Sequence, residues 1–455
     1  MYNNIVFKSE YNFLNSIAKM DYAIEFAVNN GMTHLGISDY NNMFGCYDFE
    51  SKCNSVIVCP HCHKVVKDKD KTCKHCGTDL KENPYEKAPL KHTLGLTLTV
   101  QSEYDSEKFF NLQFIAKNKT GYYSLVNLAT AANVGQKEFP HVTMQEIINN
   151  KDGLLCLTGG LIGELFDLVI NKKEEWQEYL EKLIKKFGND LWIEFTNHKV
   201  PEEKVFNKFQ PLHDYISSHN LNVVGTQHVH YIKKEYSAYR AIALDMNANP
   251  AGYEFRDKYT NYNDEFYFKN EKEMNQAFKD LLKIYPNILE NNNIIASICD
   301  NVEIPKEKAL PSFPCPNNMS DYDYLQQLVW EGFHERFSED FLNQGDNREV
   351  YENQLKLEFD VITSMGFTSY FLIVRDYINW CKDTEVYKHP EVYFPKEYFN
   401  MDEIDDLCTK KDYEIFVGPG RGSAAGSLLA YCLHITEVLD PVENRLFFER
   451  KRCAR

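Results

Sequence analysis

The chain has 455 residues, of which 43% are hydrophobic and 26% are charged, and its formal net charge at pH 7 is -17. This composition is typical of a globular protein with roughly two to four domains. The acidic net charge excludes a protein that coats nucleic acid through its overall charge, although a local basic channel remains compatible with it. No apolar run approaches the roughly 20 residues of a membrane span, so we expect no membrane association.

The thirteen cysteines bear on the cellular compartment. Four of them have a metal-type spacing and the other nine are scattered along the chain. Disulfide frameworks are typical of short secreted proteins, whereas this chain is long. The cysteine pattern therefore favours a reduced, cytoplasmic protein.

Strand-like and helix-like segments alternate from the start of the chain to about residue 235. Apolar strand signals lie at residues 5–7, 34–39, 112–116, 153–157, 191–195 and 222–225, with helical patterns between them. This alternation predicts an α/β domain, either barrel-like or doubly wound. Polar residues that end such strands are the expected place for an active site.

Residues 53–90 interrupt this alternation with a segment rich in Cys, His and Lys. It contains Cys59-x2-Cys62 and Cys73-x2-Cys76, with ten residues between the two pairs. Two such pairs can place four thiolates around one zinc ion, and four thiolates leave no open position for catalysis. We therefore predict a structural zinc site. Disulfides or chance clustering are the alternatives, and three histidines are weaker alternative ligands: His61, His63 and His75.

Residues 236–310 have the pattern of a helical connector, and longer helices begin after residue 321. An acidic, tyrosine-rich insertion occupies residues 384–411. It is followed by a predicted strand at 414–417, a glycine-rich loop and a helix at 424–432. The second half of the chain is therefore expected to combine helices with at least one strand.

The glycine-rich loop is the second candidate site. Closely spaced glycines let backbone N–H groups approach a phosphate, and an arginine can pair with phosphate oxygens. The loop is neither a Walker loop nor the dinucleotide pattern, because its glycines and its basic residue are spaced differently. Nucleotide-phosphate binding and a purely structural turn both remain open. The candidate nucleotide-binding residues are Gly418, Gly420, Arg421, Gly422, Ser423, Gly426 and Ser427.

Residues 417–431, which read VGPGRGSAAGSLLAY, resemble the nucleotide-binding loop of the bacterial DNA polymerase III alpha subunit, a C-family replicative polymerase. Residues 365–374 and 446–450 resemble the same family. The N-terminal half resembles the family's polymerase-and-histidinol-phosphatase (PHP) domain, through residues 38–45 and 229–231 among others. The resemblance covers nearly the whole chain.

The resemblance implies a PHP-like (β/α) barrel at residues 1–235 with a zinc-ribbon insertion at 53–90. A helical connector follows at 236–310, and an incomplete α+β palm at 311–455 carries the loop at 417–431. The implied activity is DNA-directed DNA synthesis, with template-primer DNA and dNTP as substrates. The implied partners are a C-terminal polymerase fragment and, through segments absent from these residues, the sliding clamp and other replisome proteins. Zinc would be structural, and Mg²⁺ is expected only in the complete polymerase site.

The sequence departs from the family pattern at two places, and each changes the function that the resemblance implies. Active PHP domains hold metals with His, Asp, Glu or Cys, whereas several aligned positions here carry poor ligands. The aligned positions are Val6, Lys8, Asp39, Tyr40, Thr97, Asn111, Gly160, His228 and His230. We therefore expect a scaffold, and not an active metal-dependent phosphoesterase, which is the rival enzyme class.

The second departure concerns the catalytic carboxylates. The family continues to a Pro-Asp-x-Asp-x-Asp-Phe strand, whereas residues 451–455 here read Lys-Arg-Cys-Ala-Arg. The sequence therefore predicts an N-terminal polymerase fragment that is inactive alone, with no catalytic residue of its own. The non-enzyme alternative is a nucleic-acid- or replisome-binding module that uses the lysine-rich zinc ribbon.

Overall fold

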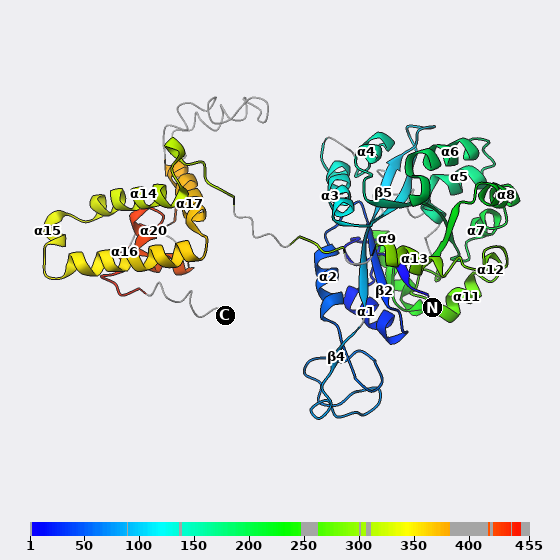
Figure 1. Cartoon of the computed structure of the whole chain (residues 1–455), viewed down its shortest axis with the longest axis horizontal. Helices are drawn as coiled ribbons and strands as arrows, with labels where there is room; N and C mark the ends of the chain where they lie inside the picture. Colours follow the sequence, from blue (N-terminus) through cyan, green and yellow to red (C-terminus); the bar gives the residue numbers. More distant parts are fainter. Residues whose placement is uncertain are drawn as a thin grey trace. The chain divides into compact units, whose positions relative to one another are not determined.

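The computed structural model describes residues 2–88, 90–135, 139–246, 263–299, 302–305, 311–382, 417–418, 422–437 and 439–446. The chain forms two compact units, Met1–Pro305 and Lys306–Arg455 (Figure 1). The insertion at 384–411, loop residues 419–421 and most of the strand predicted at 414–417 lie outside the described residues. Within the described ranges, no single helix is long and apolar enough to cross a membrane. One bent pair, Asn347–Ser364 with Thr368–Lys382, meets the length and composition criteria together.

The first unit is built on a curled sheet of seven strands (Figure 1). The strands, in spatial order, are β1 (Asn4–Phe7), β2 (His34–Tyr40), β5 (Lys91–Gln101), β6 (Phe109–Ala116), β7 (Leu154–Leu157), β8 (Leu191–Thr196) and β9 (Asn222–Thr226). Neighbouring strands are parallel except at β6, which is antiparallel to both β5 and β7. The sheet curls far enough for Phe7 to bridge Val229, just beyond β9. This half-barrel confirms the predicted α/β class.

Burial explains why these segments are strands. Nearly every residue of the sheet is buried, because helices cover its outer face and side chains fill its inner face. Strands buried on both faces read as continuous apolar runs. The sequence pattern nevertheless missed β5, in which threonines alternate with leucines. The side of β5 that carries the threonines faces the polar interior of the half-barrel and not solvent. The alternation of threonine and leucine therefore did not mark a solvent-exposed face.

Helices connect and cover the strands of the first unit (Figure 1). They are α1 (Met20–Asn29), α2 (Cys46–Ser55), α3 (Lys119–Asn133), α4 (Met144–Asn149), α5 (Glu164–Ile170), α6 (Trp176–Phe187), α7 (Pro201–Phe206), α8 (Gln210–Ser218), α9 (Ser237–Met246), α11 (Glu271–Ala277), α12 (Leu281–Ile284) and α13 (Asn291–Ile298). The apolar faces of most of them join one large core with the sheet, as expected for amphipathic surface helices, while α13 packs in a smaller cluster against β1 and β9. The helix at α3 begins where the Asn118 side chain accepts a hydrogen bond from the Gly121 amide.

The cysteine-rich insertion folds beside α1 as a small separate element. Two short antiparallel strands frame it, β3 (Ile57–Val58) and β4 (Glu86–Lys87). Its apolar cluster contains little more than Cys59, Val66, Cys73 and Leu80. A core this small cannot hold such a segment together without a further cross-link.

The second unit is helical in the residues described. It contains α14 (Asp321–Arg336), α15 (Glu339–Leu342), α16 (Asn347–Ser364), α17 (Thr368–Lys382) and α20 (Leu428–Cys432), preceded by the 3-10 turn η6 (Gly422–Gly426). The short helix α20 is almost fully buried against α14 and α16. A Cβ atom at Gly332 would lie 1.8 Å from the carbonyl oxygen of Cys432, so glycine permits this close approach of α14 to α20.

Candidate functional site

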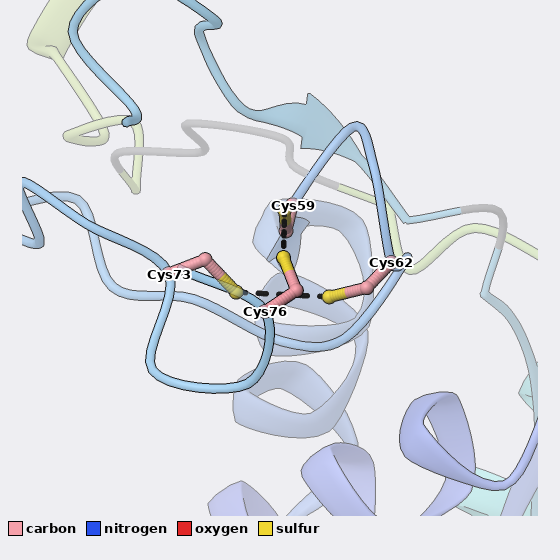
Figure 2. Close-up of side chains that lie close together, drawn as sticks. All are labelled: Cys59, Cys62, Cys73 and Cys76. Atoms are coloured by element: carbon pink, nitrogen blue, oxygen red, sulfur yellow. Dashed lines mark hydrogen bonds between the residues drawn. The ribbon is translucent and has the colours of Figure 1, made fainter. Parts of the chain in front are cut away.

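The four cysteines predicted to bind metal lie together in the insertion, and their sulfur atoms point toward one another (Figure 2). The Sγ atoms of Cys59 and Cys76 are 3.6 Å apart, as are those of Cys62 and Cys73. All four lie within 4.8 Å of one another. A tetrahedral zinc–thiolate site with Zn–S bonds of about 2.3 Å requires sulfur atoms about 3.8 Å apart. The cluster therefore has the donor set and spacing of a metal site.

Backbone geometry and one neighbouring side chain shape this cluster. Each cysteine pair sits in a tight turn, closed by the amide of His63 bonding to the Cys59 carbonyl and that of Gly77 to the Cys73 carbonyl. The Thr78 hydroxyl lies 3.1 Å from the Cys76 sulfur. Hydrogen bonds from Thr78 lower the pKa of the Cys76 thiol to about 5, which favours the thiolate that a metal requires. The three nearby histidines are not part of the group.

The insertion is held to the barrel through one residue of α1, Asn29. Its backbone carbonyl accepts a hydrogen bond from the Lys64 ammonium, and its side-chain Oδ1 accepts one from the Val65 amide at 2.9 Å. Lys64 is thus directed toward the protein and not toward solvent. The ribbon consequently has a defined attachment to the first unit.

A second cluster of buried polar groups lies inside the half-barrel, and Lys8 is at its centre. The Lys8 ammonium donates to the Ser38 carbonyl, to the Thr97 hydroxyl and, at 3.2 Å, to Oε1 of Gln113. The side chain is fully buried. Burial lowers the pKa of Lys8 to about 7, while the negative charges of Asp39 and Glu194 act in the opposite direction.

Asp39, one of the positions aligned with metal ligands, bonds to neighbouring side chains and backbone. Its carboxylate accepts hydrogen bonds from the Ser9 amide at 2.7 Å, from the Ser9 hydroxyl at 2.6 Å and from the Asn12 side chain. Burial raises the pKa of Asp39, and these hydrogen bonds work against that rise. Asp39 therefore fixes the loop after β1 and is not left facing an open cavity.

Two other positions aligned with metal ligands, Val6 and Gly160, have no side-chain donor atom to contribute. Val6 packs in an apolar cluster with Ile115 and Leu157. Gly160 has φ +50°, and a Cβ atom there would lie 2.6 Å from Cγ2 of Thr196. Except for the cysteine cluster, no group of three or more His, Cys, Asp or Glu side chains in the described residues has the spacing of a metal site.

Sequence reasoning missed the acidic residue that completes this polar interior, Glu194 on β8. Its carboxylate accepts hydrogen bonds from Nε2 of Gln113 at 2.7 Å and from the Thr226 hydroxyl, and lies 3.6 Å from Nε2 of His228. Burial disfavours its charge, but the hydrogen bonds and the charge of His228 hold the pKa of Glu194 below its ordinary value. The signal in the sequence was a single carboxylate inside the apolar strand at 191–195.

The structure describes only part of the predicted nucleotide loop. Gly420 and Arg421 lie outside the described residues, and for Gly422 and Ser423 only the backbone is described. Gly418 is exposed, with no atom within 4 Å of a Cβ built on it. Gly426 ends η6 and is buried. The grouping of these residues around a phosphate therefore stays a prediction.

Ser427, the last loop residue, is fully buried at the start of α20. Its hydroxyl donates to Oε2 of Glu358 at 2.7 Å and accepts a hydrogen bond from the Ala430 amide at 3.0 Å. Glu358 also accepts hydrogen bonds from the amides of Leu428 and Leu429. A direct contact between Ser427 and a phosphate would require the hydroxyl to leave these partners.

Two family models match the chain in the order of its two units. The PHP domain matches residues 5–198, which include the ribbon and the strands of the half-barrel from β1 to β8, but not β9. The bacterial DNA polymerase III alpha NTPase domain matches residues 323–390 and 396–451, which include the glycine-rich loop. The fold and the loop therefore define a two-part protein, a PHP barrel followed by this NTPase domain.

Relatives named DNA polymerase III subunit alpha match 97% of the chain. Identity is 29% over 460 residues for the protein from Treponema pallidum, 27% over 455 for that from Haemophilus influenzae and 25% over 448 for that from Aquifex aeolicus. The chain spans about a third of the length of these relatives, between 32% and 34%. The chain is thus similar in sequence to about a third of the length of bacterial DNA polymerase III alpha subunits, at 25–29% identity.

Proposed function

We propose that this chain supplies the part of a replicative DNA polymerase that binds the triphosphate of the incoming dNTP. The observation that carries the proposal is the match of the NTPase domain across the loop at 417–431. Glycines there would let backbone N–H groups approach the phosphates, and Arg421 would pair with phosphate oxygens. The proposed contacts come from Gly418, Gly420, Arg421, Gly422, Ser423 and Gly426. The hydroxyl of Ser427, which the sequence also offered as a contact, already donates to Glu358.

Nucleotidyl transfer needs carboxylates that hold Mg²⁺, which stabilises the negative charge of the triphosphate and the leaving pyrophosphate. The 455 residues contain no Asp-x-Asp-x-Asp triplet. We propose that a C-terminal partner, or the unsplit gene, supplies these groups, and that the 455-residue chain does not extend a primer alone. Template-primer DNA would bind across both parts, and the clamp and other replisome proteins would bind the part outside these residues.

In this proposal the half-barrel is a scaffold without phosphoesterase activity. The support is the Lys8 ammonium, which occupies the interior position where the family places metal ligands. When it is protonated, this side chain repels a divalent cation and has no lone pair to offer it.

We further propose a helical connector at residues 236–310 and an incomplete palm from residue 311, with an insertion at 384–411. We also propose that the protein is cytoplasmic.

The four cysteines would hold one structural zinc ion. The support is the spacing of the four sulfur atoms and the very small core of the insertion. Zinc in such a site contributes folding free energy directly, because the ligands are brought together only in the folded state. The ribbon would then unfold when its metal is removed, while the half-barrel would keep its own core.

The alternative role of the ribbon, nucleic-acid binding, depends on its charge. The ribbon at residues 53–90 carries seven lysines, at 64, 67, 69, 71, 74, 81 and 87, and five carboxylates, at 68, 70, 79, 82 and 86. One zinc with four thiolates carries two negative charges, which offset the excess of lysines. Lys64 is directed to Asn29, and Lys74 lies 3.6 Å from Asp70. A ribbon near neutrality lacks the field that non-specific phosphate binding requires.

Primer extension tests the proposed function. The 455-residue chain is incubated with primer-template, dNTP and Mg²⁺, alone and with a C-terminal polypeptide that begins near the Asp-x-Asp-x-Asp strand. We expect no extension by the chain alone and extension by the mixture. In the mixture, Arg421→Ala should raise the KM for dNTP at least roughly tenfold, because a charge-assisted phosphate contact is lost.

Arg348→Ala is the matched control, since this arginine on α16 pairs with Glu339 at the surface. It should leave the KM for dNTP unchanged. Extension by the chain alone would refute the need for a partner. An unchanged KM in the Arg421→Ala mixture would refute the role of the loop.

A further inference from the structure

A buried carboxylate holds the end of the glycine-rich loop. Glu358, on α16, is completely buried, and its two oxygens accept four hydrogen bonds. Oε2 accepts from the Ser427 hydroxyl at 2.7 Å and from the Leu429 amide at 2.9 Å. Oε1 accepts from the Leu428 amide at 3.0 Å and from Nε2 of Gln354 at 2.8 Å. Three of the four donors belong to residues 427–429, where the loop ends and α20 begins.

These contacts leave no backbone donor for a ligand at the first positions of α20. The amides of Leu428 and Leu429 bond to Glu358, and the amide of Ala430 bonds to the Ser427 hydroxyl. The N-terminal amides of a helix are otherwise open donors that phosphates can use. Here they are filled from inside the protein. A phosphate bound by the loop must therefore be held by residues that precede Ser427.

The same contacts fix the direction in which the loop leaves the core. Ser427 joins the loop to α20, and α20 is packed between α14 and α16, with Leu428 and Leu429 fully buried. A charged acceptor that binds a hydroxyl and two adjacent amides restrains all three groups at once. Burial raises the pKa of Glu358, because it disfavours the charged carboxylate. The hydrogen bonds that Glu358 accepts stabilise this charge and act in the opposite direction.

We infer that Glu358 is the positioning residue of the nucleotide loop, and that Ser427 acts with it as a latch and does not contact the triphosphate. The inference rests on the proposed function, because it assumes that the loop binds dNTP. It goes beyond the proposed function, because it assigns a role to Glu358, which lies about 70 positions before Leu428 in the chain. It also divides the candidate loop residues into phosphate contacts before Ser427 and a latch from Ser427 onward.

Equilibrium binding of dATP with Mg²⁺ to the full chain, followed by ³¹P NMR up to millimolar dATP, tests the inference. Glu358→Gln keeps the size of the side chain but turns one acceptor into a donor that faces an N–H group. It should weaken dATP binding at least roughly tenfold. Ser427→Ala is a smaller change, and this variant should fold. It should also weaken dATP binding.

The double variant separates a latch from a direct contact. If both residues act through one latch, the double variant Glu358→Gln, Ser427→Ala should have the same dATP affinity as the single variant that binds dATP less tightly. Independent phosphate contact by Ser427 would make the two losses multiply, and would overturn the inference. Gln354→Ala is the control: it removes a donor to the same carboxylate without touching the loop, and should keep dATP affinity within about twofold.

A purely structural role would lower the melting temperature but leave the dATP affinity of the folded variants unchanged. Equal affinity in the unsubstituted chain, in Glu358→Gln and in Ser427→Ala would therefore refute the inference and leave the proposed function standing. Failure of the unsubstituted chain to bind dATP would refute the proposed function, and the inference with it.

Discussion

The ammonium group of Lys8 lies 4.7 Å from the centroid of the Tyr40 ring, inside the half-barrel. By the resemblance in sequence, both residues align with metal-ligand positions of the family. An ammonium on an aromatic face is a favourable pair, and desolvation strengthens it. The interior of this half-barrel thus contains a basic side chain, which carries a positive charge when it is protonated.

Lys8→Met should destabilise the first unit by roughly 3 kcal/mol, because it leaves buried acceptors and carboxylates without their cation. Hydrogen-exchange mass spectrometry in denaturant, read on peptides from β2 and β5, measures this unit separately from the second one. Lys279→Met is the control, since Lys279 is exposed on the surface. Equal protection of β2 in Lys8→Met and in the unsubstituted chain would show that Lys8 does not stabilise the barrel.

The chain should hydrolyse neither DNA 3′ ends nor phosphomonoesters, even with Mn²⁺ present. The physical reason is the Lys8 charge together with the commitment of Asp39 to Ser9 and Asn12. Release of nucleotides from a labelled single strand is the measurement. Manganese-dependent release that disappears in Asp39→Asn would contradict this prediction, whereas release that survives the substitution would indicate a contaminating nuclease.

One zinc ion per chain should co-purify with the protein and should be lost in the Cys62→Ser, Cys76→Ser double variant. Elemental analysis gives the metal content, and limited proteolysis shows whether residues 56–88 become sensitive when zinc is absent. Cys315→Ser is the matched control, because this partly buried thiol of the second unit lies outside the cluster. A metal-free native protein, or full zinc content in the double variant, would rule out the assignment.

Glu265 should make the first unit sensitive to acid. Its carboxylate bonds to the ammonium groups of Lys199 at 2.6 Å and Lys234 at 2.7 Å. Burial disfavours the charge, but these lysines and Lys269 lower the pKa of Glu265 to about 2. A carboxyl whose pKa is lower in the folded state contributes stability that is present above about pH 4.5 and lost as the pH falls through about 2.

Glu265→Gln should therefore cost on the order of 2 kcal/mol at pH 7, a figure reduced for the solvent exposure of Lys199 and Lys234. The difference from the unsubstituted chain should shrink between pH 4.5 and 2. Hydrogen exchange of peptides around residues 263–270 at several pH values measures it. Glu271→Gln, at an exposed position on α11, is the control. A stability difference that stays constant with pH would contradict the role of this charge.

The sequence predicted those features that depend on neighbouring residues. The two Cys-x2-Cys pairs specify tight turns that direct two sulfur atoms to one point, and the structure brings all four together. The strands predicted near residues 5–7, 34–39, 112–116, 153–157, 191–195 and 222–225 are all present, because strands buried on both faces are marked by continuous apolar residues. The Asn118 cap of α3 is equally local.

Tertiary structure decided the surroundings of each polar side chain. Nothing near Lys8 in the sequence indicates that its ammonium meets Gln113, and nothing near Ser427 indicates Glu358 on α16. Such contacts join residues far apart in the chain, so they exist only once the barrel has curled or the helices have packed. The sequence by itself determined a barrel with a cysteine cluster and a glycine-rich loop. Packing alone decided that a lysine fills the barrel and that a buried carboxylate holds the loop, because burial forces each polar group to find its partner wherever the fold supplies one.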